Sequence, residues 1–220
     1  MKRLASLCGA ALLTAAACMP LSSHAAVEVL NEGFNDVSDL PGWTQLNLSM
    51  PPGSGWFQGN PGIFSAQDGL PGSYAGANFL SAANGMGVVD NWLITPTLTL
   101  GGLTSLSFLV NSAGTPGFSD LLEVRYASGS TGTGIDAFDT LLTTIGGEGS
   151  FPTQWQALTA TFDAPGDGRF AFRYLGDAST LDYVGLDSVR VVTAVPEPSA
   201  YLMMLAGLGA LAASARRLRK

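Results

Sequence analysis

Cysteine, histidine and lysine are almost missing from this chain of 220 residues. Both cysteines (Cys8 and Cys18) and the single histidine (His24) lie close to the N-terminus, and residues 26–194 contain none of the three residue types. That stretch therefore cannot form a serine–histidine–aspartate or cysteine–histidine relay, a zinc site of histidines and cysteines, a lysine Schiff base or a disulfide. Most familiar catalytic sites are excluded, and we interpret the protein as a non-enzyme.

Positive charge is also scarce in residues 26–194, where four arginines stand against sixteen acidic residues, a net charge of −12. A surface this negative repels nucleic acid, whose binding depends on neutralising phosphates. The stretch has no glycine-rich loop followed by lysine that could bind a phosphate group. We therefore expect no nucleic-acid partner.

Residues 1–25 have the layout of a secretory signal peptide. Two basic residues precede an apolar run over residues 4–17, and the small residues Ser23 and Ala25 precede the expected cleavage site. The run is short for the ~30 Å hydrocarbon core of a membrane, which favours export and removal by signal peptidase over a membrane anchor. A lipoprotein signal with Cys18 lipidated is a weaker alternative, because the three preceding alanines lack the usual leucine.

Residues 195–220 form a second targeting segment. The tail contains a short motif, an uncharged and mostly apolar stretch over 199–215, and a final basic cluster: Pro196, Glu197 and Pro198, then Arg216, Arg217, Arg219 and Lys220. As a helix the apolar stretch would be about 25 Å long, enough to cross a thin membrane. Basic residues directly after such a span indicate a cytoplasmic C-terminus.

These three elements, in this order at the C-terminus, resemble the PEP-CTERM sorting signal of Gram-negative bacteria. The resemblance implies cleavage by an exosortase, a membrane cysteine protease, in bacteria that secrete exopolysaccharide. The precursor would be anchored in the inner membrane with its domain in the periplasm, and would then move to the cell surface or extracellular matrix. The alternative is a plain C-terminal membrane anchor behind a proline-rich hinge.

Between the two targeting segments, apolar and polar residues alternate with the period of two that is typical of half-buried antiparallel strands. Leu106, Phe108 and Val110 share one predicted core face, while Leu186 is expected to face solvent and Val189 the core. The predicted strands cover residues 27–30, 43–48, 77–80, 92–95, 97–100, 103–111, 120–127, 141–145, 158–162, 169–175 and 186–191. Many short strands predict an all-β fold, an antiparallel two-sheet sandwich or jelly roll, with a core that needs no disulfide.

Several short motifs follow one another along this domain: Asn-Glu-Gly-Phe-Asn at 31–35, Leu-Pro-Gly-Trp at 40–43, Asp-Asn-Trp-Leu-Ile-Thr-Pro at 90–96, Asp-Leu-Leu-Glu-Val at 120–124 and Gly-Leu-Asp-Ser-Val-Arg-Val at 185–191. Their order resembles the choice-of-anchor J family, a cleaved-adhesin-like β-sandwich that is similar to MAM-type and carbohydrate-binding jelly rolls. The resemblance covers about residues 28–193, although the cysteines of MAM domains are missing.

The resemblance also implies a structural calcium site between the first and last strands. Motif position nominates Glu32 and Asp187 as ligands, with Asn35 as a weaker addition, and calcium prefers such oxygen ligands. If Asp187 shares the core side with Val189, its carboxylate must be paired or bound to metal, because an isolated buried charge is very costly. The alternative is a hydrogen-bonded acid that caps a turn or pairs with an arginine.

The four tryptophans could stack on sugar rings, since an indole offers an apolar face with a polar edge. Residues 50–90 are rich in glycine and proline, and Trp56 within them is the best candidate for an exposed aromatic, although it could instead fill the core. We therefore predict an exported, exosortase-processed surface or matrix protein with an adhesive or structural β-sandwich, associated with exopolysaccharide or biofilm. The alternatives are a carbohydrate-binding module that uses loop aromatics, and a glycan hydrolase that uses paired carboxylates.

Overall fold

The computed structural model describes residues 25–129, 134–147, 149–195 and 204–209. Its strands are β1 (Ala26–Glu32), β2 (Thr44–Asn47), β3 (Phe57–Gln58), β4 (Ala75–Asn78), β5 (Val88–Ile94), β6 (Leu98–Ser112), β7 (Leu121–Ser128), β8 (Thr140–Gly146), β9 (Gln156–Asp177) and β10 (Tyr183–Ala194). Four short 3-10 helices connect them: η1 (Phe79–Ser81), η2 (Ala83–Gly85), η3 (Ile135–Ala137) and η4 (Ala178–Thr180). The all-β prediction is confirmed.

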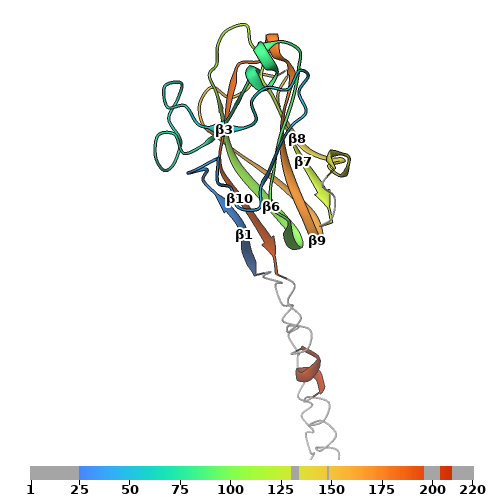
Figure 1. Cartoon of the computed structure of the whole chain (residues 1–220). Helices are drawn as coiled ribbons and strands as arrows, with labels where there is room; N and C mark the ends of the chain where they lie inside the picture. The colour runs from blue at the N-terminus through green and yellow to red at the C-terminus, as the bar shows by residue number, and fades with distance from the viewer. Residues whose placement is uncertain (1–24, 130–133, 148, 196–203, 210–220) are drawn as a thin grey trace, which may run out of the picture.

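The strands form one antiparallel sheet that curls on itself (Figure 1), rather than two separate sheets. The long strand β9 causes this continuity. Its first part, from Gln156, pairs with β6, whereas its second part, up to Asp177, lies between β5 and β7. The sequence predicted separate strands at 158–162 and 169–175, and the structure joins them across the turn-forming residues between them.

The hydrophobic core lies between the two halves of the curled sheet. Leu106, Phe108 and Val110 are at most 2% exposed, which confirms the predicted inner face of β6. Across the core, the ring of Phe108 meets that of Phe172 edge to face, with centroids 5.3 Å apart. Full burial of one such side chain stabilises the fold by about 1.5–3 kcal/mol, so this alternation accounts for a core without disulfides.

Strand β10 changes its neighbour half-way along its length. Its first half pairs with β4 and its second half with β1, and the register against β6 shifts between Asp187 and Arg190. Ser188 adopts a positive φ of 51° at this bulge. The expectation that Leu186 faces solvent is wrong, because the bulge reverses the alternation and leaves Leu186 fully buried.

The two ends of the domain lie side by side. Ala26 pairs with Ala194 in the last rung between β1 and β10, and the Val195 N–H donates to the carbonyl oxygen of Ala25 at 2.7 Å. Most loops gather at the opposite end (Figure 1). The first and the last strand of the domain therefore meet at one end of it.

Several predictions lie outside the described residues: the signal peptide except Ala25, the motif Pro196–Pro198, and the basic cluster. Of the expected membrane span over 199–215, only Met204–Gly209 is described, and it is helical and exposed. Within the described ranges, no helix has the length and apolar character needed to span a membrane.

Candidate functional site

The first predicted calcium ligand, Glu32, holds a tight turn at the end of β1. Its Oε1 accepts a hydrogen bond from the Phe34 N–H at 2.7 Å. Phe34 has a φ of 51°, which is uncommon for a residue with a side chain, and its ring is fully buried. Glu32 therefore stabilises the turn that turns Phe34 into the core.

The other two predicted ligands, Asn35 and Asp187, hold one loop, which we call the pinned loop (residues 67–73). The Asp187 carboxylate is fully buried at the β10 bulge and accepts hydrogen bonds from the backbone N–H groups of Gln67, at 3.1 Å, and Asp68. At the other end of the loop, Ser73 Oγ donates to Asn35 Oδ1 at 3.0 Å. The structure thus brings Asn35 and Asp187 to the same segment.

The position of Glu32 completes this arrangement. Glu32 pairs with Val189 in the β1–β10 ladder, two residues beyond Asp187, so both acids lie beside the point where β10 changes its neighbour. Burial raises the pKa of Asp187, against hydrogen bonds that favour the ionised form. Within the described part of the chain Asp187 makes no ion pair, so backbone dipoles stabilise its charge.

The donor set suits calcium chemically, but it is small. Two carboxylates and one amide oxygen are hard ligands, and calcium needs six to eight oxygens, so carbonyl groups or water would have to supply the rest. No group of three or more histidine, cysteine or acidic side chains that could hold a metal occurs among the described residues. The alternative to a metal ligand is an acid that is only hydrogen-bonded. Asp187 already fits that description, because its carboxylate accepts hydrogen bonds from the Gln67 N–H and from Ser188 Oγ.

Trp56 does not have the exposure that we expected of a sugar-binding residue. It is 4% exposed and packs in the core, and its indole N–H points to the carbonyl of Asn91 at 3.4 Å. The glycine-rich segment around it therefore folds onto the domain instead of extending into solvent. Trp56 only borders an open hollow of about 660 Å³ between residues 35–38, Gln45 and residues 56–58.

The polar groups of this hollow already have partners. Gln58 Oε1 accepts from the Val37 N–H at 2.9 Å, and the Gln45 amide donates to the Val37 carbonyl at 3.2 Å. These amides join the hollow's walls to each other, so few of their hydrogen-bonding groups remain for a ligand. We assign this hollow a structural role.

Sequence reasoning missed the pinned loop as the partner of Asn35 and Asp187. The available signal was the pair of turn-forming dipeptides, Asp68-Gly69 and Pro71-Gly72, which predict tight turns but not the strand on which those turns settle. Gly69 has a φ of +79°, and a side chain there would lie 3.3 Å from Asn35 Oδ1. A glycine is therefore required where the loop approaches Asn35.

Comparison with known proteins separates the tail from the domain. Residues 194–220 match the family model of the PEP-CTERM protein-sorting motif. The tail carries a sorting signal. The match begins at Ala194, the last residue of β10, so the sorting motif starts where the folded domain ends. The PEP-CTERM motif implies an exported protein that is processed by an exosortase and sorted to the surface.

The domain is similar in fold to two adhesin domains. It covers 100% of the K3 cleaved adhesin domain of Lys-gingipain from Porphyromonas gingivalis W83, over 77% of this chain, with a TM-score of 0.60 and 24% identity. The K1 domain of the same protein gives a TM-score of 0.56 and 24% identity, with 77% of this chain and 99% of that domain covered. No curated protein sequence matches the chain. These likenesses establish the fold.

Proposed function

We propose that this protein is a non-enzymatic adhesive or structural component of the cell surface or extracellular matrix of an exopolysaccharide-secreting Gram-negative bacterium. Its domain would be of the choice-of-anchor J type. One observation carries the proposal: the PEP-CTERM match starts at the residue where the adhesin-like fold ends. An exosortase that cuts close to the motif would release the whole domain without removing any strand.

Processing can be tested in cells with and without the exosortase. The precursor and mature forms are followed with an antibody against the domain, in membrane, surface and medium fractions. We expect the wild-type chain to shorten and leave the inner membrane, and the precursor to accumulate there when the exosortase gene is deleted. A Pro196→Ala, Pro198→Ala double variant should accumulate in the same way, and Thr99→Ala, an exposed change in β6, serves as the matched control. Equal maturation in all four cases would overturn the proposal.

We further propose that Glu32, Asn35 and Asp187 bind a structural calcium ion where the pinned loop meets β1 and β10. The support is that Asn35 and Asp187 contact one loop of an acidic domain, and that Glu32 pairs with Val189, two residues beyond Asp187. Melting of the full-length chain in detergent should shift upward with millimolar calcium and downward with chelator, by a few degrees. An identical midpoint in both would leave these residues as hydrogen-bonding groups only.

The alternatives are less well supported. A carbohydrate-binding module that uses Trp56 is not proposed, because that side chain is buried. A hydrolase needs two carboxylates on either side of a substrate bond. Turnover of a polysaccharide that is lost on changing a single acid would be required to replace the adhesive proposal.

A further inference from the structure

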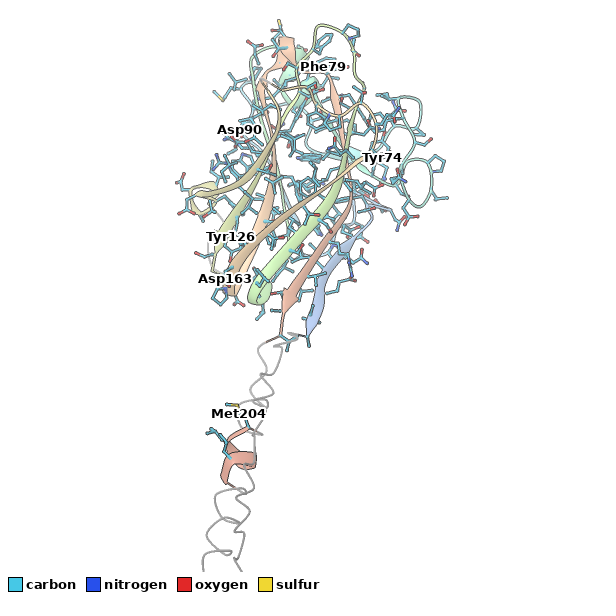
Figure 2. All side chains as sticks on the ribbon, turned by 180° about the vertical axis from the view of Figure 1, so that it is seen from behind. Tyr74, Phe79, Asp90, Tyr126, Asp163 and Met204 are labelled. Atoms are coloured by element: carbon cyan, nitrogen blue, oxygen red, sulfur yellow. The ribbon has the colours of Figure 1, made fainter. Side chains whose placement is uncertain are left out.

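A second hollow, of about 390 Å³, lies on the outer face of the sheet where β6 and β10 meet the loops. It is lined chiefly by Phe64, Gln67, Asn111, Gln154 and Trp155. These residues come from three separate parts of the sequence. Tyr74 packs against Trp155, and Figure 2 shows Tyr74 well away from Asp163, which lies near the end where the chain leaves the domain.

The aromatic wall of this hollow is rigid. The indole N–H of Trp155 donates to the Ser65 carbonyl at 2.7 Å, which fixes the plane of the ring. Phe64 and Tyr74 stack on each other with centroids 5.0 Å apart, and each meets Trp155 edge to face at 5.5 Å. Gly185 makes this packing possible, because a Cβ at that position would lie 2.8 Å from the Phe64 ring and 3.0 Å from Trp155.

The polar groups of this hollow are available, unlike those around Trp56. Asn111 is only 4% exposed, and its Oδ1 accepts from the Ser112 N–H at 2.9 Å. Its Nδ2 donates to no residue in the described part of the chain, so a nine-tenths-buried amide faces the hollow with free hydrogen-bonding capacity. The exposed side chains of Gln67 and Gln154 add two more amides, and Asp187 fixes the first of them through the Gln67 backbone.

Charge is missing from the lining of this hollow. None of its seven lining residues is acidic or basic, in a domain whose net charge is −12. Carboxamides offer both donors and acceptors, which matches the hydroxyl groups of a sugar, and a fixed indole offers a surface for its C–H face. An acidic polysaccharide would meet a repulsive field with no cation in the hollow to offset it.

We propose that the Phe64–Trp155 hollow binds the sugar rings of a neutral polysaccharide. The sugar ring would pack against Trp155, and the side-chain amides of Asn111, Gln67 and Gln154 would form hydrogen bonds with its hydroxyl groups. This inference rests on the proposed matrix role, to which it adds a binding site and a class of ligand.

The test is affinity electrophoresis of the full-length chain in mild detergent. Gels contain neutral dextran, xylan or galactan, or the acidic polysaccharide alginate. We expect at least one neutral polysaccharide to retard the wild-type chain and alginate not to. Gln67→Ala and Gln154→Ala change exposed side chains and should each weaken the retardation about 5-fold, the equivalent of one hydrogen bond. Thr44→Ala, an exposed change in β2, is the matched control and should bind as the wild type does.

Trp155→Ala should weaken binding more than 10-fold, and its melting curve shows whether the domain remains folded. If it unfolds, the two glutamine variants decide the matter. The proposal is overturned if no neutral polysaccharide retards the chain, if the glutamine variants bind as well as the wild type, or if alginate retards it most. None of these outcomes affects exosortase processing, so the binding site and the proposed function fail separately.

Discussion

Replacement of Asp187 by alanine should loosen the pinned loop without opening the core. The buried carboxylate accepts bonds from the Gln67 N–H at 3.1 Å and from Ser188 Oγ at 3.2 Å. A hydrogen bond to a charged group contributes about 1.5–3 kcal/mol. Gln67 is exposed, so water can partly replace the lost acceptor, and burial of the charge already costs part of this gain. We therefore expect a net loss of about 2 kcal/mol, near the lower end of that range.

For a domain of this size, that loss corresponds to a fall in Tm of roughly 4–8 °C. Thermal melting followed by circular dichroism measures it, and hydrogen exchange locates it, because the amides of Gln67 and Asp68 should exchange faster while those of β6 stay protected. Asp187→Asn keeps one acceptor oxygen and the shape of the side chain, so its Tm should fall about half as far. A change in Tm below 1 °C for the alanine variant, with unchanged exchange at Gln67, would show that Asp187 does not hold the loop.

Two further predictions concern buried groups. Burial raises the pKa of Asp120, which accepts a 2.6 Å bond from the Tyr174 hydroxyl. The Asp120 carboxyl group therefore binds its proton more tightly in the folded state than in the unfolded chain. The stability that this protonated group contributes is complete below the unfolded-state pKa and is lost as the pH rises through the folded-state pKa. Asp120→Asn resembles the protonated acid, so the Tm of this variant minus the Tm of the wild type should increase as the pH is raised from 3 to 7. A difference in Tm that does not change with pH would contradict the assignment. Gly185→Ala should push Phe64 and Trp155 apart, at a cost of about 1–3 kcal/mol in unfolding experiments, whereas Gly33→Ala, in open space, should be neutral; equal Tm values would refute the packing argument.

Much of the fold could be predicted from alternation alone. The core face of β6 followed from a period of two, because this strand keeps the same side toward the core along its central residues. The error at Leu186 has a physical cause: a bulge at Ser188 inserts one residue and shifts the alternation, at the point where β10 exchanges β4 for β1 as its neighbour. Neighbouring strands are set by topology, which local periodicity does not contain.

The candidate sites were less predictable because they depend on loops that settle far away in sequence. Glu32 and Asp187 were found from short motifs, yet the backbone groups that bind Asp187 come from residues 67 and 68. Trp56 was expected to be exposed because glycine and proline surround it, and tertiary packing buries it. Asn111 carries no sequence signal, since it lines a hollow with Trp155, whose packing requires a glycine in another strand.

The shared end of β1 and β10 has a mechanical consequence. If the protein is held at its C-terminus while polysaccharide pulls on the opposite loops, tension runs lengthwise through β10. The second half of that strand lies between β6 and β1, and its hydrogen bonds to both stand across the direction of pull. Hydrogen bonds that stand across the pulling direction must break together by shear, whereas hydrogen bonds along the pulling direction break one after another at lower force. The arrangement favours a domain that resists unfolding when tension acts between the cell and a bound polysaccharide.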